Sequence, residues 1–139
     1  MSKSGIIQPP GTEPGPTGVY ARGKPLVRGD LGGLMMRFRA VPRRGLVECD
    51  FGTWLNMVVM TGDEARVFAM ICRDRIKRAF GELEYSDHDF PMRVEPVPAE
   101  RVIKVTLPVL CERLSTNPHV FLVLADRLDK AVAELGAVQ

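Results

Sequence analysis

Aromatic residues are scarce in this sequence, in which Phe, Trp and Tyr together make up 6% of the chain. Proteins that bind single-stranded nucleic acids commonly stack the bases on aromatic side chains. A base-stacking surface is therefore not expected here. Contacts between basic side chains and phosphate groups do not depend on aromatic content and stay open as an alternative.

Cysteine is also rare. Its three residues, Cys49, Cys72 and Cys111, are widely spaced, and no two of them form a Cys-x-x-Cys pair. The odd number and the spacing argue against a disulfide framework and against a zinc ribbon. Cys49 and Cys72 fall on apolar faces of predicted elements, where cysteine behaves as a small hydrophobic residue. This usage indicates a reducing compartment.

Long apolar runs are absent, since none approaches the ~18 residues that a membrane-spanning helix needs. Ser2 stands where N-myristoylation requires a glycine. The glycine-rich segment 29–33 lacks the Lys-Ser/Thr pair of a phosphate-binding loop and precedes a predicted strand. We therefore expect a cytoplasmic protein that uses neither a membrane nor a cofactor.

Composition divides the chain into an arm and a domain. Residues 1–33 hold five of the eleven prolines and eight of the thirteen glycines, and their few apolar side chains offset little of the ordering entropy. They predict an extended or disordered N-terminal arm, followed by a single domain over residues 34–139. Residues 1–44 carry eight Lys/Arg against two acids, and residues 45–139 carry eleven against fifteen. The basic arm suits an anionic partner, its own domain or another copy.

Alternation of apolar and polar residues predicts a β-hairpin. Residues 34–41 and 46–60 both alternate with a period of two, and the segment 42–45 is a hairpin loop of common length. If Val41 pairs with Leu46, both faces of the hairpin agree chemically. The core face then pairs Ala40 with Val47, Phe38 with Cys49 and Met36 with Phe51, and the other face pairs Arg39 with Glu48 and Arg37 with Asp50.

The second half of the long strand has apolar residues at nearly every position. Gly52 predicts a bend, after which residues 53–60 pair with a different strand. Its odd positions, Met57 and Val59 among them, continue the core face, but the even positions Trp54, Val58 and Met60 are apolar too. This half should therefore be covered on both faces, and we expect the function at the surface that covers it.

Capping signals predict the helices. Thr61 and Glu64 form a capping box that starts a helix ending near Phe80, with Gly81 as a left-handed stop. Asn117 followed by proline predicts the start of a last helix that ends at Gly136. The opening of that helix, residues 119–125, is apolar nearly all round and should be buried in the domain or in an oligomer interface.

The remaining segments complete the predicted fold. Residues 90–94 predict a short edge strand, residues 101–107 a strand, and residues 108–114 a short helix. We find no internal repeat in the sequence. The order of elements predicts an α+β fold, in which a small antiparallel sheet of three or four strands packs against two to three helices.

Asp87, His88 and Asp89 are the residues best suited to catalysis or metal binding, with His119 and Cys111 as candidate partners. They lack the spacing of a known metal motif, and a loop with Asx turns explains them equally well. A small enzyme with its site at these residues is therefore the third functional hypothesis.

The first two hypotheses concern binding. The first is a non-enzymatic interaction or assembly protein that binds a protein partner or its own copies through the arm and the surface of the sheet or last helix. The second is a small nucleic-acid-binding protein that uses the basic arm and the Arg43-Arg44 loop, with Arg66, Arg73 and Lys77 on one helix face. The predicted partner-binding residues are Tyr20, Arg22, Lys24, Arg28, Arg43, Arg44 and Trp54.

Overall fold

The computed structural model describes residues 37–51, 56–88, 90–108 and 113–137. The predictions for the arm, the Met36–Phe51 pair and the Gly52 bend concern residues outside these ranges and remain predictions. The same holds for the site residues Tyr20, Arg22, Lys24, Arg28, Trp54, Asp89 and Cys111.

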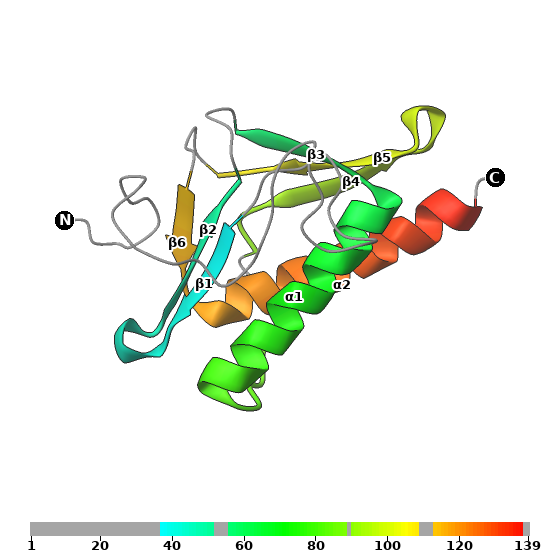
Figure 1. Ribbon diagram of the computed structural model, residues 1–139. Coiled ribbons are helices and arrows are strands. Elements are labelled where there is room, and N and C mark those ends of the chain that lie inside the picture. Colours follow the sequence, from blue (N-terminus) through cyan, green and yellow to red (C-terminus); the bar gives the residue numbers. More distant parts are fainter. Residues whose placement is uncertain (1–36, 52–55, 89, 109–112, 138–139) are drawn as a thin grey trace.

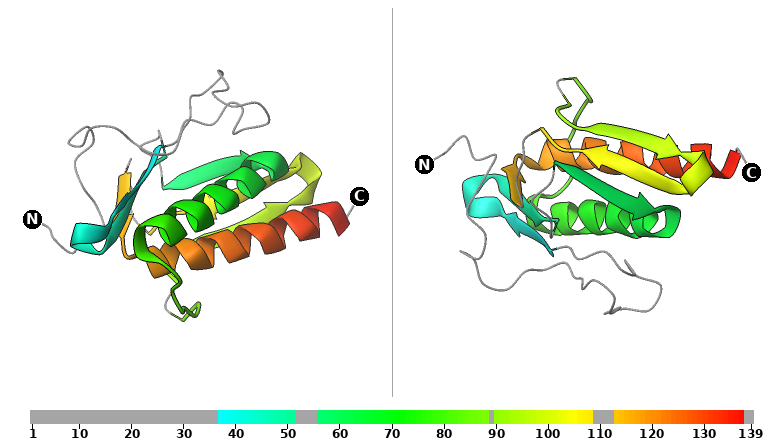
Figure 2. Two further views of the ribbon diagram at one scale, coloured as in Figure 1. Left: turned by 60° about the horizontal axis from the view of Figure 1, so that its bottom comes forward. Right: turned by 90° about the horizontal axis from the view of Figure 1, so that it is seen from above.

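Eight main elements follow one another along the described chain (Figure 1). They are β1 (Arg37–Val41), β2 (Leu46–Asp50), β3 (Met57–Thr61), α1 (Gly62–Phe80), β4 (Arg93–Val97), β5 (Val102–Thr106), β6 (Arg113–Thr116) and α2 (Pro118–Ala137). The strands form two antiparallel sheets, sheet A in the order β1-β2-β6 and sheet B in the order β3-β5-β4. The two helices lie side by side on one face of the sheets and run in opposite directions (Figure 2). The α+β class is confirmed, but two sheets replace the single sheet that we predicted.

The predicted hairpin register is confirmed at each of its described pairs. Phe38 lies opposite Cys49 and Ala40 opposite Val47, while Arg39 lies opposite Glu48 and Arg37 opposite Asp50. The loop closes with a hydrogen bond from the backbone N–H of Gly45 to the carbonyl oxygen of Pro42, and Gly45 has a left-handed backbone with φ 67°. Local turn geometry and matching on both faces together determine this register.

The central strands keep one register through both sheets. The two residue numbers of each pair add up to 163 in both sheets, for Val47 with Thr116 as well as for Met57 with Thr106. The backbone N–H of Leu107 also donates to the carbonyl oxygen of Asn56 at 2.6 Å, with the same sum. No net insertion therefore separates the two sheets along these strands.

The structure contains an internal repeat that the sequence did not reveal. Each element of the second half begins 56 residues after its counterpart: β4 after β1, β5 after β2, β6 after β3 and α2 after α1. The turns repeat as well, because Pro42–Arg44 and Pro98–Glu100 are both 3-10 turns that end in a left-handed residue, Gly45 and Arg101. The prediction of no internal repeat is therefore wrong at the structural level.

The two halves are related by an approximate two-fold axis. When each residue is replaced by its counterpart 56 positions away, the pair of Val47 and Thr116 in sheet A becomes the pair of Ile103 and Met60 in sheet B. Arg73 of α1 forms an ion pair of 2.7 Å with Asp129 of α2, and Asp129 is the residue that occupies the position of Arg73 in the second half. Two copies of one identical half would place like charges there, so this difference between the halves stabilises their association.

The core lies between the helices and the inner faces of both sheets. Phe38 of β1 packs edge-to-face against Phe68 of α1 and Phe121 of α2, at ring-centroid distances of 6.2 and 5.5 Å. The apolar opening of α2, from Phe121 to Ala125, is buried in this core. It therefore does not provide the exposed last-helix surface that we had considered for partner binding. Neither described helix has an apolar stretch long enough to cross a bilayer.

Capping determines where both helices begin. The Thr61 hydroxyl accepts from the backbone N–H of Glu64, and the Glu64 carboxylate accepts from the backbone N–H of Thr61, as predicted. At the start of α2 the Asn117 side chain accepts from the backbone N–H of Val120. Gly81 ends α1 with φ 83° and ψ −162°, a conformation open essentially only to glycine but different from the left-handed one predicted. Gly136 does not stop α2, which continues to Ala137.

Three further predictions about the strands are corrected. The segment predicted as a helix over residues 108–114 contains the start of β6, because Leu114 pairs with Cys49 in sheet A. The edge strand predicted at residues 90–94 lies at Arg93–Val97. In β3, Val58 and Met60 face the core, whereas Met57 and Val59 are exposed. Phe51 and Val58 are both buried although they lie an odd number of residues, seven, apart. The buried apolar positions therefore change from odd-numbered residues in β2 to even-numbered residues in β3.

Candidate protein-interaction surface

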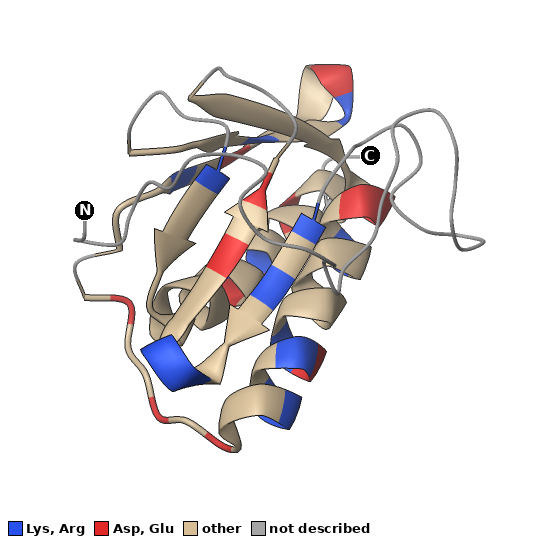
Figure 3. Cartoon of the chain, turned by 60° about the vertical axis from the view of Figure 1, so that its left-hand side comes forward, with Lys and Arg blue, Asp and Glu red and all other residues tan. Residues whose placement is uncertain are grey.

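The outer face of sheet A, away from the helices, is charged, and its central residues are buried. Glu48 of β2 is only 4% exposed. Its carboxylate lies 3.6 Å from the guanidinium of Arg39 on β1 and 4.0 Å from that of Arg113 on β6. Figure 3 shows the basic segments of β1 beside the acidic segments of β2 on this face. Arg39 is thus part of an ion-pair cluster within the fold, as the hairpin register suggested.

On the outer face of sheet B, the edge strand β3 exposes apolar side chains instead of burying charged ones. Met57 and Val59 of β3 are 39% and 46% exposed, respectively. Beside them on β5 lie Thr106 and Lys104, which are partly buried. Two large apolar side chains are therefore exposed next to each other on the helix-free face of the sheet.

The corresponding strand of the second half, β6, allows a direct comparison with β3. The counterparts of Met57 and Val59 in the other half are Arg113 and Ser115 of β6, which are 5% and 0% exposed. At equivalent places, the polar pair is buried and the apolar pair is exposed. Because burial normally favours apolar side chains, this inversion marks β3 as a surface suited to a partner.

The two edge strands of sheet B differ in the residues that oppose further strand pairing. β4, at the opposite edge of sheet B, carries the charged residues Arg93 and Glu95 and the non-donating Pro96. Charge and proline at an edge prevent pairing with another strand. The segment Met57–Thr61 contains neither a charged residue nor a proline.

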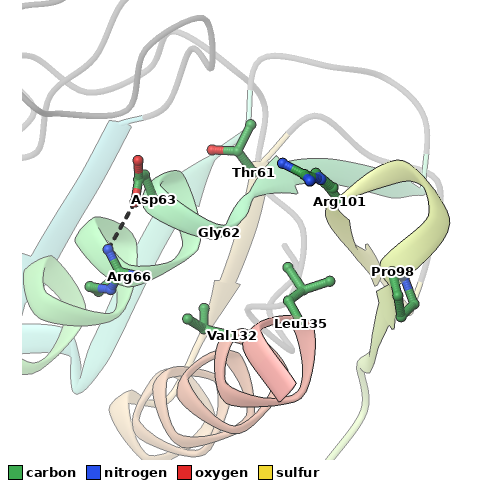
Figure 4. A pocket seen from close by; sticks show the side chains of 9 residues that line it. Thr61, Gly62, Asp63, Arg66, Pro98, Arg101, Val132 and Leu135 are labelled. Carbon is green, nitrogen blue, oxygen red and sulfur yellow. Dashed lines mark hydrogen bonds and ion pairs between the residues drawn. The ribbon is translucent and has the colours of Figure 1, made fainter. Parts of the chain in front are cut away.

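A cavity of about 640 Å³ lies at the start of α1, between the β4–β5 turn and the end of α2. Figure 4 shows Asp63 and Arg66 joined by an ion pair of 2.8 Å, with Arg101 across the opening and Leu135 among the apolar lining. The counterpart of Arg66 is the buried Leu122. Since Asp63 offsets the charge of Arg66, the lining defines no particular class of ligand.

The predicted basic site is only partly present in the described residues. Arg43 and Arg44 are exposed at the tip of the β1–β2 hairpin. Three helix residues predicted as free cations form ion pairs instead: Arg66 with Asp63, Arg73 with Asp126 and Asp129, and Lys77 with Glu82. Hydrogen bonds and charge from the two aspartates raise the pKa of Arg73, although burial acts to lower it.

The candidate residue Asp87 attaches the segment that connects the two halves to α2. It forms an ion pair of 2.8 Å with Arg127 of α2, whose hydrogen bond and charge lower the pKa of the Asp87 carboxyl. The guanidinium of Arg127 also lies 4.9 Å from the ring centre of Phe90. Tyr85 donates to Asp126 at 2.8 Å, and its phenol pKa is raised by burial and by that hydrogen bond. These contacts hold Tyr85, Asp87 and Phe90 against α2.

The other candidates for chemistry lie apart. His119 contacts Asn117 at 3.3 Å at the start of α2, and His88 is exposed in the connection between the halves. Cys49 and Cys72 are buried in the core as predicted, and burial raises the pKa of the Cys72 thiol. Within the described ranges, no three His, Cys, Asp or Glu side chains come together as metal ligands.

Sequence reasoning drew attention to this segment but predicted the wrong face of β3 to be buried. It drew attention to residues 53–60 because both faces of that segment are apolar, and it named Trp54. Met57 and Val59 were assigned to the core because their parity matches that of Phe51. A period-two pattern does not reveal the change of parity between two sheets.

No protein-family model, curated protein or solved structure matches this chain.

Proposed function

We propose that this protein is a non-enzymatic interaction or assembly protein that binds a protein partner, or another copy of itself, at sheet B. The observation that supports this most is the exposure of Met57 and Val59 where the counterpart positions are polar and buried. Complete burial of such a side chain contributes about 1.5–3 kcal/mol. Since the two are already partly buried, covering both would contribute roughly 2 kcal/mol to binding.

The basic N-terminal arm is a second element of the proposal. Residues 1–44 have an excess of basic residues, and the rest of the chain has an excess of acidic residues. An arm of this composition gains order when it lies on another surface, so it suits a protein whose subunits or partners bind one another through extended segments.

The state of the other candidate residues favours binding over catalysis. Asp87 forms an ion pair with Arg127, and Arg66, Arg73 and Lys77 form ion pairs with acids of the same chain. These groups have structural partners, which leaves the β3 surface as the best candidate for function.

A photo-crosslinking amino acid at position 59 tests the proposal in cells that produce the protein. The matched control carries the same amino acid at position 95, which is exposed on the opposite edge of sheet B. We expect covalent adducts with protein from position 59 and few or none from position 95. Equal yields from both positions, or no adducts from position 59, would contradict the proposal.

A further inference from the structure

We infer that the partner contributes an extended, uncharged segment with apolar side chains on both faces, which pairs with the edge of β3 opposite β5 and lies beside α1. This inference rests on the proposed function and specifies the binding mode and the chemistry of the partner. It starts from the edge of β3, where β5 is the one neighbouring strand among the described residues and Met57–Thr61 itself carries no charge or proline that would oppose pairing.

The outer side of the inferred site is apolar. Met57 and Val59 are exposed on this face, and a strand added along β3 would place alternate side chains directly beside them. Side chains on neighbouring antiparallel strands lie about 4.5–5.5 Å apart, so an apolar pair there excludes water. A charged side chain in the added strand would find no opposite charge on β3.

The inner side is apolar as well, through one flank of α1. Val67 and Ile71 are partly buried against the core. Each residue turns a helix by ~100°, so both lie on the side of α1 opposite Arg73, which contacts α2. Figure 2 shows α1 on the β3 side of the molecule and α2 on the β4 side. The inward side chains of an added strand would therefore lie near Val67 and Ile71.

The position of α1 favours a lone extended segment over a second folded domain. α1 begins directly after Thr61 at the end of β3 and stays on the β3 side of the molecule in both views of Figure 2. A second copy of this domain docked edge to edge along β3 would bring its own α1 against α1. A single strand needs only the ~4.8 Å spacing of one sheet position. Backbone hydrogen bonds would then supply affinity, and the two apolar sides would supply selectivity.

The test uses the full-length protein and a synthetic peptide, acetyl-Lys-Thr-Val-Ile-Val-Ile-Thr-Lys-amide, in which charges occur only at the ends. The control peptide carries aspartate in place of both isoleucines. Amide chemical shifts and hydrogen exchange of the protein are followed during titration. We expect shifts and slower exchange within Met57–Thr61, shifts at Val67 and Ile71, and at least tenfold weaker binding of the control peptide.

Two protein variants locate the binding site. Val59→Lys adds an edge charge of the kind that opposes strand pairing, and it should weaken peptide binding at least tenfold while the far-UV circular dichroism stays unchanged. Glu95→Lys adds the same side chain on the other edge of sheet B and should leave the affinity unchanged. Val67→Lys tests the inner side separately and should weaken binding as Val59→Lys does.

Several results would overturn the inference. They are the absence of binding at millimolar peptide, equal affinity for Val59→Lys and wild type, or shifts that map to sheet A or to the cavity at the start of α1. Slow exchange of the β3 edge amides in the free protein would also overturn it, because the edge would then already be occupied. If position 59 still crosslinks to protein in cells, the proposed function stands while the inferred mode fails.

Discussion

Removing the charge of Glu48 should cost a large part of the stability of the fold. The variant Glu48→Gln keeps the shape of the side chain and leaves Arg39 and Arg113 without the carboxylate between them. At an effective dielectric constant of ~20, a charge pair 4 Å apart interacts by ~4 kcal/mol. Breaking a buried pair typically costs about 3–5 kcal/mol, because the remaining buried charge loses an attraction that water does not replace.

We place Glu48→Gln at the lower end of that range. The Arg113 side chain is 5% exposed, but that of Arg39 is 27% exposed, so water screens one of the two pairs. The expected loss in the free energy of unfolding is therefore about 3 kcal/mol. For a chain of this size, that loss lowers the midpoint of thermal unfolding by about 10 °C.

Urea unfolding followed by far-UV circular dichroism measures this loss. The matched control is Glu95→Gln in sheet B, where the ion pair of 3.0 Å with Arg93 is exposed and should contribute less than ~1 kcal/mol. If Glu48→Gln unfolds within ~0.5 kcal/mol of wild type, or no lower than the control, then the reasoning about the buried cluster is wrong.

Three further predictions concern the caps, the thiols and the connection between the halves. Thr61→Ala and Asn117→Ala remove the caps at equivalent helix starts, so each should lower the free energy of unfolding by about 1 kcal/mol; a loss at one site alone would contradict their equivalence. In a Cys111→Ser background, the buried Cys72 should react with a thiol reagent only upon unfolding, since burial raises its pKa; rapid labelling of the native protein would refute this. The pKa of Asp87 is lower in the folded than in the unfolded chain, so its ion pair stabilises the fold above the unfolded pKa of ~3.9, and this contribution is lost as the pH falls through the folded pKa. Asp87→Asn should therefore lower the midpoint of thermal unfolding at pH 6 but have little effect near pH 3, and an equal effect at both pH values would argue against this role.

Local signals in the sequence were sufficient for several parts of the fold. The β1–β2 register followed from a short loop and from matching residues on both faces, such as Phe38 with Cys49 and Arg39 with Glu48. The start of α1 followed from Thr61 and Glu64, which lie within one helical turn. These features depend on residues close together in the chain, so their chemistry can be read directly.

The missed elements depend on contacts between distant residues. Leu114 lies in a strand because it pairs with Cys49, 65 positions away, and no local pattern encodes that partner. The repeat escaped notice because few equivalent residues are identical; Pro42 with Pro98 and Ala69 with Ala125 are among those that are. Only the shared bounds of the elements and the shared turn geometry make the two-fold axis visible.

The sequence by itself determined the register in which residues 46–50 pair with the described part of the predicted strand 34–41, and it showed that the following segment is apolar on both faces. The tertiary structure alone decided which of those faces is exposed. Because the chain passes from sheet A to sheet B between Phe51 and Val58, the buried positions change parity, and Met57 and Val59 become exposed on the outer face of sheet B. A pattern of period two gives the alternation of a strand, but only packing against the helices determines which side is the core.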